Sequence, residues 1–228
     1  MMGVPYGCCN VLASALTFDK HTCNTYLKSY GVNVADSVML IRGMAYDVNE
    51  IINEVGLPCF VKPNAEGSSF GVTKVKEAAQ LEDALKKAFA LCQEVLIETF
   101  IDGTELTCGV VKAGDMDIAM PIAEVIPKNE FFDFEAKYDP TKSDEIIPAR
   151  ISPELTNRIK TLSSMIYDIL RCEGIIRVDY IVRDDEIFML EVNTTPGMTS
   201  NSFVPKMVRA MGGTLREVLT KIIDNKLN

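Results

Sequence analysis

The side chains best suited to chemistry are Asp179, Glu191 and Asn193, which fall within a hairpin pattern over residues 174–193. Residues two apart on a strand share a face, so Glu191 and Asn193 point to one side, and a tight turn brings Asp179 beside them. This group supplies several oxygen ligands and no nitrogen or sulfur ligand, which suits Mg²⁺ or Mn²⁺. The competing interpretation is a solvated strand face on which Arg177 pairs with Asp179. A Pro-Gly turn directly after the second strand favours the metal site, because functional residues often lie at such strand ends.

A second group of residues could bind phosphate. Lys62 ends an apolar strand pattern, where its stem can be buried while its ammonium group stays exposed. The loop that follows, residues 64–71, contains two glycines and the hydroxyls of Ser68 and Ser69. Backbone N–H groups in such a loop can surround phosphate oxygens, although the Walker pattern of a P-loop is absent. Taken alone, the loop is explained at least as well by an ordinary hairpin turn.

Other candidates are weaker by themselves. Lys20 lies in the first helical pattern, where an exposed lysine is the simplest interpretation. Lys137 lies in residues 131–138, an aromatic-rich polar stretch that needs a packing surface or a ligand. A strand pattern ends near Glu98, where backbone groups could meet a flat base, and a carboxylate seven residues on, Glu105, could bind ribose hydroxyls. The alternative for this last pair is a strand end and a surface acid.

The composition excludes several classes of protein. The 228 residues include 32 Asp and Glu against 23 Lys and Arg, a net charge of −9, whereas a nucleic-acid-binding surface is normally basic. The same balance gives no support to a basic membrane-binding face. No apolar run reaches the length of a membrane span, and no signal peptide is visible at the start. We therefore expect a cytoplasmic protein with no nucleic-acid or membrane partner.

Cysteine and histidine usage narrows the chemistry further. The seven cysteines form no CxxC pair, which predicts reduced thiols as in a cytosolic protein. His21 is the single histidine, which argues against a zinc enzyme and against a Ser-His triad.

The spacing of apolar residues and turn signals predicts a mixed α+β chain. We expect helices over residues 10–30, 47–55, 77–92 and 152–172, and two short helices on either side of Gly212-Gly213. We expect strands within 32–41 and over 58–62, 72–75, 95–98, 105–113, 117–126, 174–183 and 186–193. Residues 127–149 show little regular pattern, and a loop of this length inside a domain is usually a functional lid or disordered. A boundary near Asp102-Gly103 gives two α+β halves.

Together these segments resemble the ATP-grasp enzymes, and specifically the D-alanine–D-alanine ligases. The resemblance covers almost the whole chain. The matching residues are 3–6, 13–16, 19–20, 61–63, 66–69, Glu98, Glu105, 135–138, 177–179 and 191–200. The resemblance implies an α+β ATP-grasp fold in which two subdomains clasp ATP between them. Residues 1–102 would form the central subdomain with the phosphate loop 64–71, and residues 103–228 the C-terminal subdomain with the lid loop 127–149 and the metal hairpin 174–193.

The resemblance also implies a role for each candidate residue. The ATP phosphates would be bound by Lys20, Lys62, Lys137, Ser68 and Ser69, the adenine by Glu98, Thr99, Ile101, Phe131, Ile181 and Leu190, and the ribose by Glu105. Two Mg²⁺ or Mn²⁺ ions would be held by Asp179, Glu191 and Asn193. The reacting groups would meet Arg177, the N–H of Gly197, Ser68 and Tyr138, and the substrates would be bound by Lys137, Arg177, Gly197 and Ser202.

The implied reaction joins two D-alanines into D-alanyl-D-alanine for peptidoglycan synthesis. ATP phosphorylates the carboxylate of one D-alanine, and the amine of the second displaces phosphate from the acyl phosphate. Family members carry roughly 80 to 100 further residues at the N-terminus, a domain-sized piece. We therefore expect this polypeptide alone to bind ATP and Mg²⁺ but to make little or no dipeptide. The alternatives are a nucleotide-binding ATP-grasp module without ligase activity and another ATP-grasp ligase, for example one that uses D-lactate. The resemblance leaves a homodimer open.

Overall fold

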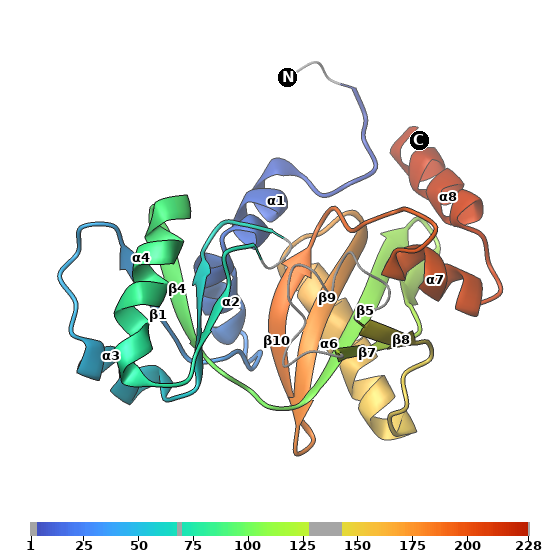
Figure 1. Ribbon diagram of the computed structural model, residues 1–228. Coiled ribbons are helices and arrows are strands. Elements are labelled where there is room, and N and C mark those ends of the chain that lie inside the picture. The colour runs from blue at the N-terminus through green and yellow to red at the C-terminus, as the bar shows by residue number, and fades with distance from the viewer. Residues whose placement is uncertain (1–3, 68–69, 128–142, 228) are drawn as a thin grey trace. The chain divides into compact units, whose positions relative to one another are not determined.

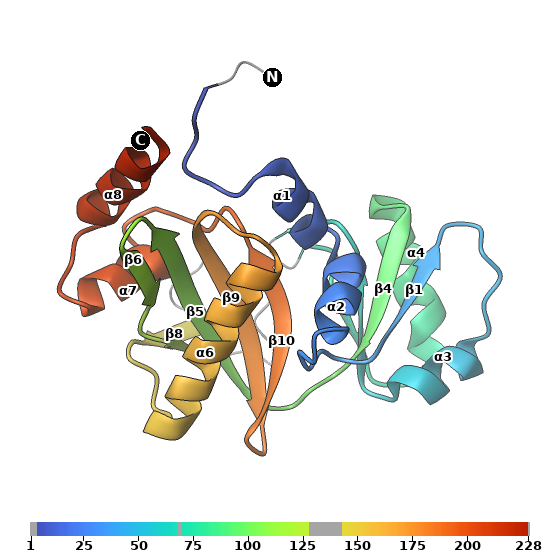
Figure 2. The same cartoon turned by 180° about the vertical axis from the view of Figure 1, so that it is seen from behind.

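A four-stranded sheet and a six-stranded sheet organise the part of the chain that the structure describes, residues 4–67, 70–127 and 143–227 of a computed structural model (Figures 1 and 2). Each sheet lies at the centre of one unit. Unit 1 consists of Met1–Thr17, Thr104–Ile126 and Glu145–Asn228, and unit 2 of Phe18–Gly103 and Pro127–Asp144. The sequence predicts a division near residue 102, whereas the structure also groups Met1–Thr17 with the C-terminal residues.

Unit 2 arranges its antiparallel strands in the order β1-β4-β2-β3. Its elements are α2 (Lys20–Lys28), β1 (Ser37–Ile41), α3 (Val48–Val55), β2 (Cys59–Pro63), β3 (Thr73–Val75), a 3₁₀ turn (Ala78–Gln80), α4 (Leu81–Leu91) and β4 (Glu94–Thr99). Alternate residues of β2 and β4, such as Val61 and Ile97, pack in a core with α3 and α4. The opposite face of these strands therefore carries Phe60, Lys62 and Glu98.

Helix α2 begins at a break that apolar spacing alone does not predict. The sequence predicts one helix over residues 10–30, but the chain forms α1 (Val11–Phe18) and then α2. Between them Asp19 is extended, with φ −85° and ψ 100°, and its carboxylate accepts a hydrogen bond from the backbone N–H of Thr22 at 2.9 Å. Aspartate is common at this position because its carboxylate accepts a hydrogen bond from a backbone N–H of the first turn that has no partner within the helix. The break places Lys20 in the first turn of a new helix.

Two other helices begin where the sequence predicts; α3 also ends as predicted, whereas α6 (Pro153–Ile169) ends before the predicted end at residue 172. Helix α3 begins after Asp47, whose carboxylate accepts hydrogen bonds from two backbone N–H groups, and stops at Gly56, which has a φ of +71°. Helix α6 begins after Ser152, whose hydroxyl accepts a hydrogen bond from a backbone N–H of the first turn. Pro153 fits the first helical position because its missing N–H has no partner to lose there.

Unit 1 has the strand order β10-β9-β5-β7-β8, with β6 paired to β5. Its elements include β5 (Thr104–Ala113), β6 (Met116–Ala119), β7 (Ala123–Pro127), β8 (Ser143–Ile146), α6, β9 (Gly174–Arg183), β10 (Glu186–Asn193), α7 (Phe203–Ala210) and α8 (Leu215–Leu227). Helix α6 packs on β5, and its Ser163 hydroxyl lies 2.7 Å from that of the fully buried Tyr180 on β9. On the other face of β5 and β9, Val111 and Ile175 pack with α7 and α8. That face continues along both strands to Thr107 and Asp179.

The structure corrects two expectations in this region. The sequence predicts one strand over residues 117–126, but β6 and β7 are separate and pair with different parts of β5. The interruption contains Pro121, which cannot donate a ladder hydrogen bond. Within the predicted loop 127–149, residues 143–146 form β8 at the edge of the sheet, whereas residues 128–142, on which the lid prediction rests, lie outside the described residues.

The segment before α1 packs tightly against the start of β9. Gly174 has a φ of +68°, and a Cβ at this position would lie 2.1 Å from the carbonyl oxygen of Gly7. The sulfur of Cys9 in turn accepts a hydrogen bond from the backbone N–H of Glu173 at 3.3 Å. These contacts explain why Met1–Thr17 groups with unit 1.

We expect Gly174→Ala to destabilise unit 1 more than Gly212→Ala does. Gly212 has a similar φ of +79°, but no atom lies within 4 Å of the place that an added methyl group would take. Both variants therefore carry the cost of a left-handed residue, about 1–2 kcal/mol. Only Gly174→Ala adds a clash, for which we expect a further loss of about 1–3 kcal/mol. Urea unfolding followed by circular dichroism measures the difference, and equal losses for the two variants would contradict the tight packing.

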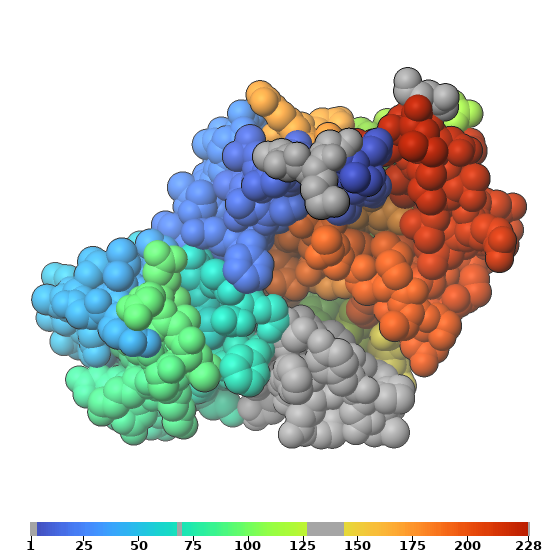
Figure 3. Space-filling view, turned by 90° about the horizontal axis from the view of Figure 1, so that it is seen from above, coloured from blue at the N-terminus to red at the C-terminus, as the bar shows by residue number. Residues whose placement is uncertain are grey.

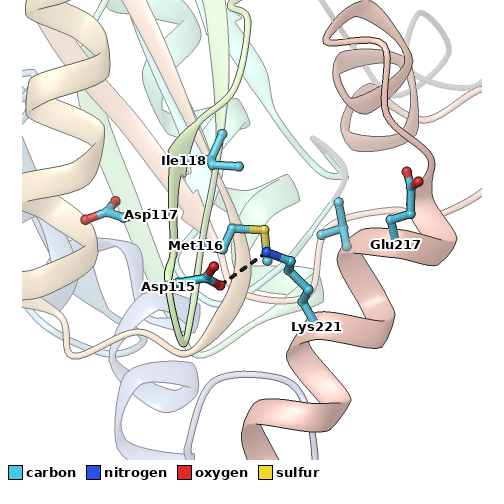
Figure 4. A pocket seen from close by; sticks show the side chains of 7 residues that line it. Asp115, Met116, Asp117, Ile118, Glu217 and Lys221 are labelled. Carbon is cyan, nitrogen blue, oxygen red and sulfur yellow. Dashed lines mark hydrogen bonds and ion pairs between the residues drawn. The ribbon is translucent and has the colours of Figure 1, made fainter.

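Helix α8 lies at the surface of unit 1, in the red region of Figure 3, and borders a shallow pocket of about 330 Å³. The pocket is lined by Asp115 from the turn before β6, by Met116 and Asp117 from β6, and by Glu217 and Lys221 from α8. Lys221 pairs with Asp115 at 3.2 Å across its mouth (Figure 4). None of the predicted site residues lines this pocket. Among the described residues, no helix combines the length and apolar character needed to span a membrane.

Candidate active site

One face of the unit 1 sheet carries many of the residues that the sequence predicts for the site. Strand β9 presents Arg177, Asp179 and Ile181 on this face, because side chains alternate along a strand. Strand β5 lies beside it, with Thr107 opposite Asp179 and Glu105 opposite Ile181. The predicted ribose ligand therefore lies next to a predicted adenine contact.

Strand β10 completes this face through a β-bulge. Met189 is opposite Tyr180 and Glu191 is opposite Asp179, so Leu190 is an extra residue in β10. Simple alternation predicts Leu190 on the face opposite to Glu191. The bulge instead leaves both side chains partly exposed between two buried neighbours, on the face of Asp179. Bulges often occur beside active sites, where they redirect a side chain.

The carboxylate of Asp179 is the centre of a polar network on this face. Arg177 donates from Nε to Oδ1 and from Nη2 to Oδ2, both at 2.8 Å, and the hydroxyl of Thr107 donates to Oδ1 at 2.6 Å. The side chains of Arg177 and Asp179 are only 16% and 18% exposed. The ion pair of the competing interpretation is therefore present, and it fixes the orientation of the predicted metal ligand.

Asp179, Glu191 and Asn193 lie close enough together to hold one cation. Asn193 Nδ2 lies 3.1 Å from Asp179 Oδ2 and 3.4 Å from Glu191 Oε1. The oxygen and nitrogen of an amide are nearly isosteric, so a half-turn of the amide would direct its oxygen toward the two carboxylates. Two carboxylates and an amide oxygen form a hard donor set, which fits Mg²⁺ or Mn²⁺. Across the described ranges, no group of three or more His, Cys, Asp or Glu offers another metal site.

The charge of Arg177 is secured by its surroundings. Burial lowers the pKa of Arg177, but the negative charges of Asp179, Glu191 and Glu145 raise it by more, so the guanidinium stays protonated. Its central carbon lies 5.6 Å from the centre of the Phe203 ring, at the start of α7. A fixed cation is thereby held at the edge of the predicted metal site.

The loop after β10 brings the predicted residues Gly197 and Ser202 together. A Cβ on Gly197 would lie 2.8 Å from the hydroxyl oxygen of Ser202, so any larger residue would displace that hydroxyl. Ser202 directly precedes α7, and its hydroxyl lies 2.8 Å from that of Thr199. The Ser202 hydroxyl therefore lies beside the backbone of Gly197, which no side chain covers at that position.

In unit 2, Lys62 and Glu98 form an ion pair on the sheet face that points away from α3 and α4. Their side chains are 15% and 8% exposed. Phe60, opposite Glu98 in the sheet, packs edge-on against Phe100 with ring centres 5.7 Å apart. The ammonium of Lys74 lies 3.7 Å from the centre of the Phe100 ring. This face combines cationic groups with flat apolar surface, as a nucleotide requires.

The remaining unit 2 candidates lie at the ends of elements. Lys20 begins α2, and its ammonium donates to the carbonyl of Glu66 in the predicted phosphate loop. Thr99 ends β4, and its hydroxyl donates to the carbonyl of Val55 at 2.7 Å. Ile101 is only 5% exposed, so a contact with adenine would involve its backbone.

Five predicted site residues lie outside the described residues: Ser68, Ser69, Phe131, Lys137 and Tyr138.

Two residues that hold the predicted ones in place are missed by the sequence analysis. Thr107 is 2% exposed and donates a hydrogen bond to Asp179. Because it lies two residues after Glu105 on one strand, it shares a face with that candidate, and this spacing was a signal for its place in the site. Asn64 is fully buried and bonds the segments that carry Lys20 and Lys62. Its position after a proline is typical of an exposed turn, so no local signal predicts its burial.

Comparison with known proteins places these features in one family. A family model described as D-ala D-ala ligase C-terminus matches residues 26–224. A D-alanine–D-alanine ligase of Bacteroides fragilis is 55% identical over 227 residues, which cover 99% of this chain and 70% of that protein. One of Parabacteroides distasonis is 53% identical over 100% of this chain and 69% of that protein.

Solved structures agree with the family match. The crystal structure of a D-alanine–D-alanine ligase from Bacillus anthracis complexed with ATP has a TM-score of 0.84 and 33% identity, covering 99% of this chain and 72% of that one. The VanG D-Ala:D-Ser ligase from Enterococcus faecalis has a TM-score of 0.84 and 35% identity, covering 98% and 66%. The ATP-grasp fold and the α+β class are thereby confirmed. The chain belongs to the D-alanine–D-alanine ligase family.

Proposed function

We propose that the chain provides the ATP-binding part of a ligase that joins two D-alanines through an acyl phosphate, for the synthesis of peptidoglycan. The observation that carries the proposal is the identity of 55% over 99% of the chain to a D-alanine–D-alanine ligase. The clustering of the predicted ligands on one face of the unit 1 sheet supports it. In the reaction the γ-phosphoryl group of ATP passes to one carboxylate, and the amine of the second D-alanine then displaces phosphate.

The unit 1 residues would act on the reacting groups. Asp179, Glu191 and Asn193 would hold the magnesium or manganese ions that accompany ATP, which neutralise polyphosphate charge when bound. Arg177 would stabilise the negative charge that develops as the amine attacks, because its guanidinium is held in place and largely shielded from water. The N–H of Gly197 would donate to the same oxygen, and Ser202 would bind the carboxylate of the second substrate.

The unit 2 residues would bind the nucleotide. Lys62 and Lys20 would contact phosphate oxygens. Lys62 lies at the end of β2, just before loop 64–71, and the ammonium of Lys20 contacts that loop at the Glu66 carbonyl. Glu98 would accept a hydrogen bond from the adenine amino group, and backbone groups at Thr99 and Ile101 would meet the ring edge. From unit 1, Glu105 would bind the ribose and Ile181 and Leu190 the adenine face. Ser68, Ser69, Phe131, Lys137 and Tyr138 keep the roles that the resemblance implies.

A second acceptor is worth testing, because one similar structure is a D-Ala:D-Ser ligase. Supplying D-alanine, D-serine and D-lactate in competition, with products separated by mass, measures the choice directly. We expect D-alanyl-D-alanine as the main product. A cytoplasmic location is proposed from the composition and the cysteine pattern. A homodimer is proposed from the resemblance, and size-exclusion chromatography tests it.

The metal site gives the most direct test of nucleotide binding. We expect Glu191→Gln to weaken binding of ATP about 10- to 100-fold at fixed Mg²⁺, because one ionised ligand is lost. Calorimetry measures the Kd for both proteins with Mg²⁺ and with EDTA. The difference should disappear in EDTA, because the substituted group acts through the metal.

Glu186→Gln is the matched control, since Glu186 is an exposed residue at the other end of the same strand. It should bind Mg²⁺–ATP as the parent does. Equal affinity of Glu191→Gln and the parent at saturating Mg²⁺ would contradict the metal assignment.

A further inference from the structure

The side chain of Asn64 lies at the centre of a buried hydrogen-bond network in unit 2. It is 0% exposed. Its Nδ2 donates to Asp19 Oδ1 at 2.9 Å and to Glu94 Oε2 at 3.0 Å, and its Oδ1 accepts from the backbone N–H of His21 at 2.9 Å. Both amide hydrogens and the amide oxygen are therefore used, which fixes a single orientation of the group.

Its backbone extends the same network. The N–H of Asn64 donates to the carbonyl of Glu94 at 3.0 Å, and its carbonyl accepts from the N–H of Lys20 at 3.4 Å. Asn64 thus joins the first turn of α2, the end of β2 and the start of β4. Lys20 opens α2, and Lys62 lies two residues before Asn64 on the chain.

We infer that Asn64 is a positioning residue, which holds the first turn of α2 against the end of β2 so that Lys20 and Lys62 can bind the phosphates of one nucleotide. This inference rests on the proposed function. Asn64 itself is fully buried, so its effect on a bound nucleotide would pass through the two lysines.

An amide is the group that this position requires. Its two donors face two carboxylates, Asp19 and Glu94, while its oxygen faces a backbone N–H. Aspartate would place a third carboxylate in the same buried space, and leucine would remove one hydrogen bond from each of Asp19, Glu94 and the His21 N–H. Burial raises the pKa of Asp19, but hydrogen bonds from the backbone of Thr22 and from the Asn64 amide lower it by more, so Asp19 stays ionised as a partner.

The test compares ATP with adenosine, because adenosine has the base and ribose but no phosphates. In Asn64→Asp, the Kd of Mg²⁺–ATP should rise about tenfold or more, which corresponds to the loss of at least one charge-assisted contact. The Kd of adenosine should stay within about twofold. A purely structural role would change both constants together, or change only the melting temperature.

Three further variants control the result. Asn49→Asp makes the same chemical change at an exposed residue of α3, and Ile51→Val removes one buried methyl group from the unit 2 core. Neither should change the ATP-to-adenosine ratio. The triple variant D19N/N64D/E94Q keeps an acceptor for the His21 N–H and restores the other two side-chain hydrogen bonds with donor and acceptor exchanged. It should recover most of the ATP affinity.

If Asn64→Asp does not fold, Asp19→Ser replaces it, because serine keeps a helix cap but is too short to reach the amide. It should show the same loss for ATP without a loss for adenosine. Equal weakening of both ligands, or no weakening of ATP, would overturn the inference while leaving the proposed function intact. Failure of the folded parent to bind Mg²⁺–ATP would overturn the proposed function and the inference together.

Discussion

Replacing Arg177 by methionine should lower kcat about 10²- to 10³-fold, the usual cost of removing one group that stabilises a developing negative charge. The Kd of Mg²⁺–ATP should change much less, by under about tenfold, because the charge that Arg177 stabilises develops only in the transition state and Thr107 still bonds Asp179 in the variant. The protein for this measurement is the chain joined to the part of the Bacteroides fragilis relative that lies outside the match, which we call the joined enzyme. Phosphate release and dipeptide formation give kcat, and calorimetry gives Kd.

Arg183→Met is the control for this prediction, since Arg183 is an exposed residue at the end of the same strand. It should leave kcat unchanged. Arg177→Lys keeps the charge but loses the planar, two-bond contact with Asp179, so we expect an intermediate kcat. If Arg177→Met weakened ATP binding as much as it lowered kcat, Arg177 would act in nucleotide binding instead.

Replacing Lys62 by methionine should affect both stability and binding. The carboxylate of Glu98 is 8% exposed and would lose its cation, for which we expect a loss of about 3–5 kcal/mol in the free energy of unfolding. The Kd of Mg²⁺–ATP should rise about 10- to 150-fold, because a charge-assisted contact with phosphate contributes about 1.5–3 kcal/mol. Urea unfolding and calorimetry measure the two effects separately.

The double variant K62M/E98Q separates the two roles of Lys62. Neutral glutamine removes the unpaired charge, so most of the lost stability should return. The affinity for Mg²⁺–ATP should stay low, because no ammonium group remains at the phosphates. Recovery of ATP affinity together with stability would mean that Lys62 is only a structural partner of Glu98.

Some features of the fold follow directly from local sequence. The hairpin of β9 and β10 is predicted by period-two alternation and by Asp184-Asp185, both of which have positive φ in the structure. Helices α3 and α6 begin after the predicted cap residues, and α3 also ends at the predicted glycine. In these segments the residue types alone favour one backbone conformation.

Other features depend on contacts that a sequence does not display. The extra residue Leu190 is invisible to an alternation pattern, because the residues around it fit a regular strand as well. The break at Asp19 is hidden by apolar residues on both sides, although aspartate is a common N-cap. Burial of Asn64 depends on Asp19 and Glu94, which are distant in the chain.

The candidate site also has parts that the sequence predicts and parts that depend on the fold. Residue types predict the group of Asp179, Glu191 and Asn193, but a regular hairpin would pair Glu191 with Val178, and it is the bulge at Leu190 that places Glu191 opposite Asp179. The contact of Thr107 with Asp179 needs the pairing of β5 with β9, which no local pattern specifies. Roles in binding ATP and D-alanine came from the family resemblance.

Product analysis of the joined enzyme tests the central claim most directly. The enzyme is incubated with ATP, Mg²⁺ and D-alanine, and D-alanyl-D-alanine, ADP and phosphate are measured together. We predict one dipeptide and one phosphate for each ADP, at a turnover of about 1–10³ s⁻¹. A folded joined enzyme that binds Mg²⁺–ATP yet forms no dipeptide from D-alanine would contradict the account.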